Sequence, residues 1–335
     1  TKARDNIDQD SQANRQMLEA AAQLAADSLE TLRDMGHLHL DSYNALPLKH
    51  SLFRDNNTAF FLPVYNAIRE AFKSKALLPK HGGGFVDAQS ARLARGAQLA
   101  DIFSSDQLGT LFGTEKLFWL ETGITADRMP EFHSYLVGKR KSWPPKEWEQ
   151  EPLAEGVKLE AKNLAEKVTP EFFKAQSEDW LAGLYAYLKT DYTHFEKTPF
   201  LRLDSGEHVP PEKAFLPPSH ANEINPSLFP LVKKSLTDQQ EIRAFLVDTV
   251  KLREPNRVDV ITKCLLPKYR DGNLAFDESS YERDLQEVIE SHAEANPDDA
   301  KRLITELKST PFIACMPASG LSAEGVSEFL CVRRE

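Results

Sequence analysis

The sequence has few of the features that mark disulfide-rich, zinc-binding or membrane proteins. Its 335 residues include three cysteines, Cys264, Cys315 and Cys331, and none has the CxxC spacing of a zinc ribbon. No apolar run approaches the ~20 residues that a membrane-spanning helix needs, and no signal peptide opens the chain. Lys and Arg number 41 against 51 Asp and Glu, and the net charge of −10 disfavours broad binding to a phosphate backbone. These absences favour a protein of the reducing cytoplasm, without a membrane partner.

Catalytic motifs are missing as well. The sequence contains no GxSxG, no HExxH and no paired Cys and His arrangement for nucleophilic catalysis. Residues 80–84, KHGGG, lack the GxxxxGK[ST] frame of a phosphate-binding loop, and their glycines are typical of a hairpin turn with positive φ. We therefore predict no enzymatic activity, no catalytic residue and no cofactor for this chain.

An internal repeat is the main positive feature of the sequence. Residues 198–217 alternate apolar side chains around an Asp-Ser-Gly turn, which predicts a β-hairpin. Residues 76–94 match this pattern without gaps, with Leu78 at the place of Leu201. Residues 310–332 open with the same Thr-Pro-Phe and reach Val326 after a longer turn. The sequence thus predicts three related hairpins at a period of about 110–125 residues.

The repeat predicts a division into modules. We expect an N-terminal connecting helix within 1–45, module 1 over 46–145, module 2 over 146–270 and a partial module 3 over 271–335. Residues 139–156 carry adjacent prolines and mixed charge, which is typical of an exposed connector between modules. Within the modules, Trp119-Leu120 is expected to correspond to Phe245-Leu246, and the helix from Met129 to the helix from Arg257. The predicted fold class is α+β, mainly α, as an elongated series of tandem helix and β-hairpin modules.

A first candidate site is His37, His39 and Asp41. Their period-two spacing places both imidazoles and the carboxylate on one face of an expected extended segment, where they could ligate zinc or iron. The other interpretation, which we favour, is a solvated strand face over Leu38 and Leu40. We predict no metal.

A second candidate site is the run Lys139, Arg140, Lys141 and Trp143. Cations interleaved with an aromatic side chain are typical of a contact with nucleic acid or with an acidic partner. A solvated linker is the alternative interpretation.

The order of helices and hairpin also resembles a winged helix in outline. Residues 129–139 or 257–269 would then form a recognition helix and the hairpin a wing. Arg257 and Lys263 are the candidates for reading bases in the second module. Glu131 and His133 take the similar places in the first, which argues against DNA reading by both modules.

Several stretches resemble one family. The residues are RDNI at 4–7 with Asn14 and the Ala-rich helix behind it, the LLP…FV.A..A.LA hairpin, FLVDTVKLREPNRVDVITKCLLPKY, and TPFIA near the end. They look like the region just downstream of the ATP-binding domain in large sacsin-like bacterial proteins. Those proteins open with a GHKL-type ATPase, the fold shared by heat-shock chaperones, gyrase and histidine kinases.

The resemblance implies that the chain is a piece of a longer polypeptide whose upstream residues bind ATP. It transfers no ATP-site residue to this sequence, because the acidic-and-Asn helix and the glycine lid motifs of the ATPase are missing. We expect a non-catalytic middle segment that couples an upstream ATPase domain to a protein partner. The alternative is a winged-helix-like nucleic-acid-binding segment of a bacterial defence or DNA-processing ATPase.

Overall fold

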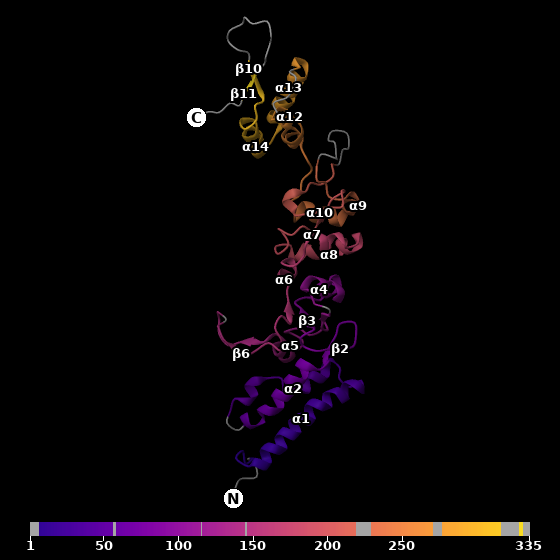
Figure 1. Cartoon of the computed structure of the whole chain (residues 1–335), viewed down its shortest axis with the longest axis vertical. Helices are drawn as coiled ribbons and strands as arrows, with labels where there is room; N and C mark the ends of the chain where they lie inside the picture. The colour runs from indigo at the N-terminus through magenta and orange to yellow at the C-terminus, as the bar shows by residue number, and fades with distance from the viewer. Residues whose placement is uncertain are drawn as a thin grey trace. The chain divides into compact units, whose positions relative to one another are not determined.

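The computed structural model describes residues 7–55, 58–114, 116–144, 146–218, 229–270, 277–315 and 328–330. These residues form two compact units. Unit 1 comprises Thr1–Phe172 and Asp179–Phe195, and unit 2 comprises Phe173–Glu178 and Glu196–Glu335. Both units are α+β and mainly helical, as predicted, with small sheets of two or three strands (Figure 1). In the described part of the chain, no helix is both long and apolar enough to cross a bilayer.

The elements of the first half of the chain are α1 (Gln12–Asp34), the 3-10 helices η1 (Leu40–Ala45), η2 (His50–Phe53) and η3 (Ala59–Phe61), α2 (Leu62–Ser74), β1 (Leu78–Pro79), β2 (Phe85–Val86), β3 (Ala91–Ala94), α3 (Ala97–Ile102), α4 (Ser105–Phe112), β4 (Phe118–Trp119), α5 (Pro130–Val137), β5 (Lys139–Arg140), β6 (Trp148–Gln150), β7 (Lys158–Leu159), α6 (Ala161–Ala165), α7 (Pro170–Lys174) and α8 (Glu178–Asp191).

The later elements are β8 (Leu201–Arg202), β9 (His208–Val209), η4 (Pro211–Lys213), α9 (Lys234–Thr237), α10 (Gln240–Asp248), α11 (Arg257–Val260), the π-helix η6 (Ile261–Leu265), α12 (Leu266–Arg270), α13 (Glu278–Glu294), α14 (Pro297–Lys308), β10 (Ile313–Cys315) and β11 (Glu328–Leu330).

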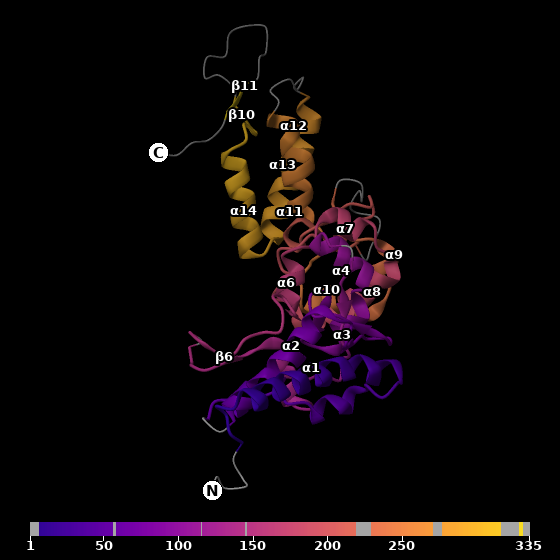
Figure 2. The same cartoon turned by 60° about the horizontal axis from the view of Figure 1, so that its bottom comes forward.

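Unit 1 begins with a helix that has clear start and stop signals. The side chain of Ser11 accepts a hydrogen bond from the Asn14 N–H at the start of α1, and Gly36 follows its last turn with φ of +74°. One face of α1, with Ala22, Ala26 and Leu29 buried, packs on α2, as Figure 2 shows. The rest of the helix surface is polar or exposed.

The core of unit 1 lies between α2, α5 and the first hairpin. The Tyr43 ring stacks on Phe132 with centroids 4.3 Å apart, and the Tyr43 hydroxyl donates to the Leu77 carbonyl at 2.6 Å. Leu153 and Val157, at 2% and 1% exposure, belong to the same core. The interpretation of residues 139–156 as a connector is therefore wrong, because the stretch returns to the core of unit 1.

The three predicted hairpins are confirmed. β1 and β2 pair Leu78 with Val86, and β8 and β9 pair Leu201 with Val209, so the two turns have the same register. Glycines 82–84 all have positive φ, as predicted for this turn. In the third hairpin Ile313 pairs with Leu330. The predicted partner Val326 lies outside the described residues.

Main-chain hydrogen bonds around the first hairpin resemble those around the second. Four of these bonds in unit 1 have a counterpart in unit 2. The pairs, written as donor N–H to acceptor carbonyl, are His81 to Trp119 and Asp204 to Leu231; Glu121 to Pro79 and Lys233 to Arg202; Leu120 to Arg92 and Val232 to Phe215; and Leu93 to Val157 and Leu216 to Arg253. The strand pairing repeats as well, since Lys80 bridges Leu120 as Leu203 bridges Val232. Each unit thus contains one copy of the same backbone motif.

These bonds correct two predicted correspondences. Trp119-Leu120 corresponds to Leu231-Val232 and not to Phe245-Leu246. The counterpart of α5 is α10, because Leu153 N–H donates to the Leu136 carbonyl as Leu252 N–H donates to the Leu246 carbonyl, both at 2.9 Å. The helix from Arg257 instead corresponds to α6. Both begin at a residue whose N–H donates to a side chain three positions later, Glu160 to Asn163 and Asn256 to Asp259.

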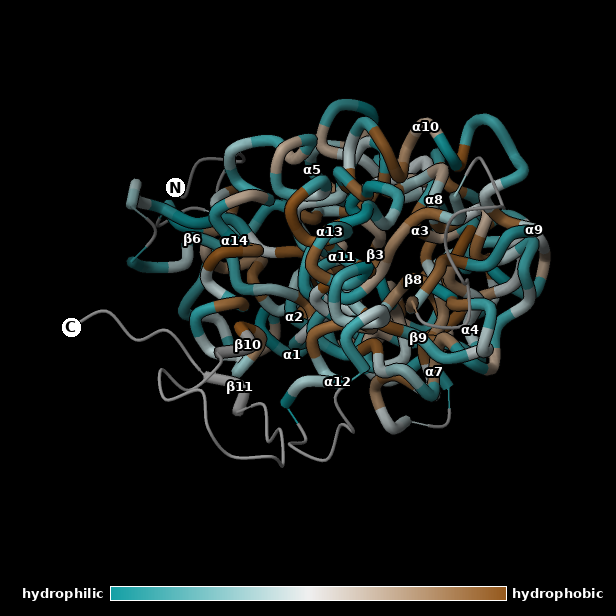
Figure 3. The backbone as a smooth tube through the Cα atoms, turned by 90° about the horizontal axis from the view of Figure 1, so that it is seen from above, coloured by the Kyte–Doolittle hydropathy of each residue, from teal (hydrophilic) through white to brown (hydrophobic). Residues whose placement is uncertain are grey.

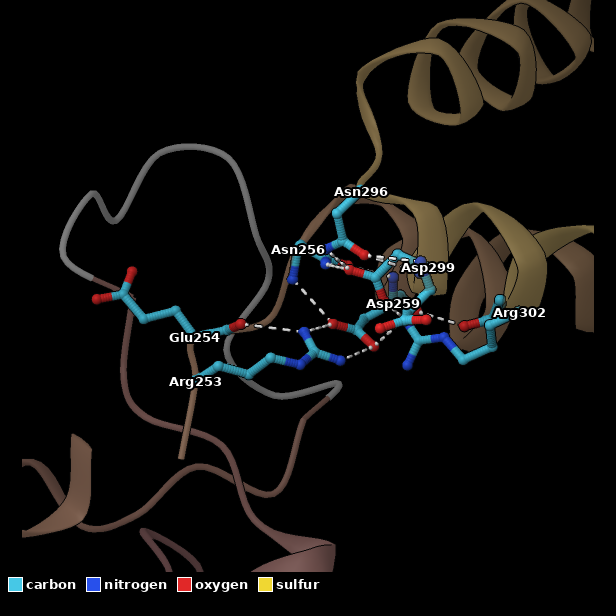
Figure 4. A network of polar contacts seen from close by, with 9 residues as sticks. Arg253, Glu254, Asn256, Asp259, Asn296, Asp299 and Arg302 are labelled. Atoms are coloured by element: carbon cyan, nitrogen blue, oxygen red, sulfur yellow. Dashed lines mark hydrogen bonds and ion pairs between the residues drawn. The ribbon is translucent and has the colours of Figure 1, made fainter. Parts of the chain in front are cut away.

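A polar network holds α11 against α14 in unit 2 (Figure 4). Its centre is Asp259, whose side chain is 2% exposed. Arg253 donates to both carboxylate oxygens at 2.5 and 3.0 Å, and Arg302 approaches from α14 at 2.9 Å. Asn256 donates through its side chain to Asp299 at 2.7 Å. Burial opposes ionisation of Asp259, but the hydrogen bonds from Arg253 and Asn256 outweigh it and lower the pKa of the carboxyl group.

Candidate interaction surface

The feature that distinguishes unit 1 from the equivalent part of unit 2 is an inserted hairpin. Residues 138–152 join α5 to Leu153 and contain β5 and β6, which pair Arg140 with Trp148. In unit 2 the same connection is made by residues 248–251, where Lys251 has a φ of +64°. Figures 1 and 2 both show the hairpin reaching away from the helices of its unit. We call residues 139–150 the β5–β6 hairpin.

Local packing explains why this segment forms a hairpin. Gly138 has a φ of +80°, and a Cβ at this position would lie 2.6 Å from the Trp148 ring, so a glycine is required where the chain turns into β5. The Arg140 guanidinium lies 4.0 Å from the centroid of the Trp148 ring. Nearer the tip, Lys141 N–H donates to the Glu147 carbonyl, and Lys146 N–H donates to the Ser142 hydroxyl.

The base of the hairpin is held by two arginines, Arg54 directly after η2 and Arg69 of α2. Arg54 donates to the Glu149 carbonyl at 3.0 Å, and Arg69 of α2 donates to the carbonyls of Glu151 and Pro152. Hydrogen bonds from a charged donor to a main-chain carbonyl are stronger than bonds between neutral groups. The β5–β6 hairpin is therefore attached to unit 1 at a defined angle instead of hanging from it as a loose loop.

The outer part of the hairpin is open to solvent. Trp143 is 91% exposed, the largest value among the exposed apolar residues of the described chain. Lys139, Arg140 and Lys141 are exposed on the neighbouring strand. Figure 3 shows the segment around β6 as mainly hydrophilic. The structure thus brings together the four residues predicted from the sequence, as an aromatic side chain beside three cations.

Acidic side chains balance part of this charge. The Lys141 ammonium lies 4.0 Å from the carboxylate of Glu147, and Arg54 pairs with Glu149 at 3.8 Å. The side of the hairpin with Lys139, Arg140 and Lys141 therefore faces a side with Glu147 and Glu149. This mixed surface offers less attraction to a continuous phosphate backbone than the cation run alone predicts.

Two hollows flank the base of the hairpin. The smaller, of about 200 Å³, lies beside the ion pair of Lys49 with Glu131 and includes Lys139. The larger, of about 530 Å³, is an open polar trough that includes Arg69 and Lys73. Next to it, three buried polar atoms lack a hydrogen-bond partner: Arg69 Nη1, Gln150 Nε2 and the Tyr135 hydroxyl. Burial raises the pKa of Tyr135, so its phenol stays protonated.

The predicted metal candidates lie elsewhere in unit 1 and do not share a strand face. His37 and His39 follow α1, and η1 begins at Leu40, so helical geometry interrupts the period-two spacing before Asp41. His39 Nδ1 lies 2.9 Å from the His37 carbonyl and 3.1 Å from the Ser42 hydroxyl. Within the described ranges, no group of three or more His, Cys, Asp or Glu side chains could hold a metal ion.

The base-reading candidates Arg257 and Lys263 make contacts within unit 2, and Glu131 and His133, at the similar places of unit 1, are also partly engaged or buried. Glu131 forms an ion pair with Lys49, and burial lowers the pKa of half-buried His133, with a further effect of Lys158. Arg257 contacts three glutamates of α13, namely Glu287, Glu290 and Glu294. Lys263 lies over the rings of Phe215 and Phe229. Reading a base edge would require these contacts to break.

The sequence did not predict the supporting residues of the hairpin. Arg54, Arg69 and Trp148 act through main-chain and ring contacts that leave no pattern in the sequence. The one available signal was the second tryptophan, which follows Trp143 by five residues and can lie on the opposite strand of a hairpin. No protein-family model, no curated protein and no solved structure matches this chain.

Proposed function

We propose that this chain is a non-catalytic interaction segment of a larger ATP-dependent, sacsin-like protein of the cytoplasm, and that it couples an upstream ATPase domain to a protein partner. The β5–β6 hairpin is the observation that carries the proposal. It is inserted into one of two otherwise equivalent backbone motifs, and it presents Trp143 with three cations. Trp and Arg are the residues most enriched at the centres of protein interfaces.

The geometry of the hairpin base supports coupling. Arg69 of α2 donates to Glu151 and Pro152, directly after β6, and α2 in turn packs on α1, so a displacement of these helices would be passed to the base of the hairpin. The hydrogen bonds from Arg54 and Arg69 are the physical contacts through which such a displacement would pass. The ATPase domain itself is an expectation from the family resemblance alone.

The first experiment tests whether ATP binds upstream of this chain and not to it. The coding sequence upstream of Thr1 is expected to contain a GHKL motif set. Calorimetry with Mg-ATP is expected to detect no binding to residues 1–335, because the nucleotide site lies in the upstream domain. Micromolar binding of ATP by residues 1–335 would contradict the proposal.

The second experiment tests coupling in the full-length parent. Hydrogen exchange is measured with and without a non-hydrolysable ATP analogue. We expect the exchange rates of amides in 139–150 to change with nucleotide, and those in 297–308 of unit 2 serve as the internal comparison. If no amide of residues 1–335 responds to the nucleotide, coupling through this chain is refuted.

The third experiment addresses nucleic acid. A gel shift with duplex and single-stranded DNA is expected to show no retardation by residues 1–335 at physiological salt. Retardation with a steep salt dependence, lost when Lys139, Arg140 and Lys141 are replaced by alanine, would favour the nucleic-acid alternative instead.

A further inference from the structure

The second face of α1 is apolar and uncovered. Met17, Leu24 and Met35 are 70%, 68% and 63% exposed, and they lie on the side of the helix opposite to the residues that pack on α2. Long exposed apolar side chains usually occur singly on a protein surface, and a row of them marks a contact surface. At 1.5 Å rise per residue, this row runs for about 27 Å along the helix.

The row follows the spacing of a coiled coil. Its positions alternate at intervals of four and three residues, and no member carries a charge. We call this row the α1 seam, and its residues are Met17, Ala21, Leu24, Ser28, Thr31 and Met35. This is the alternation of a and d positions in a heptad repeat, which keeps a seam facing one partner helix. The Ser28 hydroxyl donates to the Leu24 carbonyl at 2.7 Å, so the hydroxyl is satisfied within α1 and can be buried.

The α1 seam is complementary to itself when reversed. Its residues are arranged symmetrically about the level of Ala26, so an antiparallel copy would place Met17 against Met35, Leu24 against Ser28 and Ala21 against Thr31. Each pair occurs twice, as an isologous interface requires. The large Leu24 packs against the small Ser28, and Ala21 packs against Thr31, so two helices can approach closely along the whole seam.

We propose that two copies of this chain associate through an antiparallel pairing of their α1 seams. The charges beside the seam are compatible with this arrangement. Asp27 is the acidic residue nearest the two-fold axis, where it would face its own copy. Lys75, directly after α2, lies 3.1 Å from Asp27 and also contacts Glu30, so each copy neutralises its own carboxylates before they meet. The hydrogen bonds from Gln23 and Lys75 lower the pKa of Asp27.

The first test is the mass of residues 1–335 by sedimentation over about a hundredfold range of concentration. We expect a concentration-dependent dimer. Leu24→Glu places a charge in the middle of the seam and should weaken association at least about tenfold. The matched control is Gln16→Glu, which adds the same charge to an exposed position of α1 outside the seam and should change the dissociation constant by less than about threefold. Circular dichroism confirms that both variants are folded.

A monomer at every concentration, or equal effects of Leu24→Glu and Gln16→Glu, would overturn the proposal. The second test determines the direction of the helices. Met17→Cys and Met35→Cys are made singly and together, then oxidised. The two positions are about 27 Å apart within one chain, too far for an internal disulfide.

In an antiparallel pair, the double variant forms a linked peptide that joins position 17 to position 35, identified by mass spectrometry. Neither single variant forms a disulfide between identical positions. Links of 17 to 17 and 35 to 35 in the single variants would show a parallel pair and overturn the proposed register. The wild type, with its own cysteines, is oxidised alongside as the control.

Discussion

Replacing Asp259 by asparagine is expected to destabilise unit 2 without affecting unit 1. The substitution keeps the shape of the side chain but removes the negative charge that Arg253 and Arg302 share (Figure 4). Breaking a buried ion pair by removing one partner costs about 3–5 kcal/mol. The two arginine side chains are 44% and 39% exposed, so they regain water when the carboxylate is lost. We therefore expect the free energy of unfolding of unit 2 to decrease by about 3 kcal/mol, at the lower end of this range.

The tryptophans make the assay specific to a unit. Trp119, Trp143, Trp148 and Trp180 all lie in unit 1, so their fluorescence during urea unfolding reports unit 1, whereas circular dichroism reports the helices of both units. Asp259→Asn should lower the midpoint of the transition seen by circular dichroism and leave the fluorescence transition in place.

The control is Asp248→Asn, which removes an exposed carboxylate from the end of α10. It should change the stability of unit 2 by less than about 0.5 kcal/mol. Equal midpoints for the two variants would refute a stabilising role for the network. A shift of the fluorescence transition by Asp259→Asn would refute its confinement to unit 2.

Two further predictions concern a buried histidine and a pair of glycines. Burial, with a contribution from Arg202, lowers the pKa of His208 to about 4, so the folded state holds this ring neutral while the unfolded chain protonates it near pH 6.5. As the pH falls from 6.5 to 4, the free energy of unfolding of unit 2 should therefore decrease by up to about 3 kcal/mol. His208→Gln should reduce the slope of unfolding free energy against pH in this range. An unchanged slope would exclude His208 as its source. Gly138→Ala should destabilise unit 1 by about 2–3 kcal/mol, because the new Cβ meets Trp148. Gly156 has a φ of +69° and no atom within 4 Å of a Cβ, so Gly156→Ala should destabilise unit 1 by only about 1 kcal/mol. Urea unfolding followed by tryptophan fluorescence measures both losses. Equal losses of stability in the two variants would show that backbone strain alone, and not the contact with Trp148, causes both.

The hairpins could be predicted because their signals are local. Alternating apolar residues around glycines 82–84 and Gly206 determine both the strand pairing and the turn, and the structure confirms them. The long helices α1 and α14 were predictable for the same reason, since Ser11 and Asn296 cap them and apolar residues recur at helical spacing.

The correspondence between the two units could not be predicted from side chains. Equivalent positions hold Trp119 and Leu231, or Arg92 and Phe215, and the bonds that relate them run between main-chain atoms. An apolar pair such as Phe245-Leu246 is common enough to match by chance. The charged stretch 139–156 was misinterpreted because Leu153 and Val157, which return it to the core, are too few to form a periodic pattern.

The different lengths of the connection after α5 and after α10 show where this backbone motif accepts new sequence. Unit 1 accommodates residues 138–152 there, while unit 2 closes the same gap with residues 248–251, and the flanking main-chain bonds are the same in both. The site is therefore a natural point for grafting. Hairpins of other composition could be installed after α10 without disturbing the buried strands on either side, which would give one scaffold two independently chosen recognition tips.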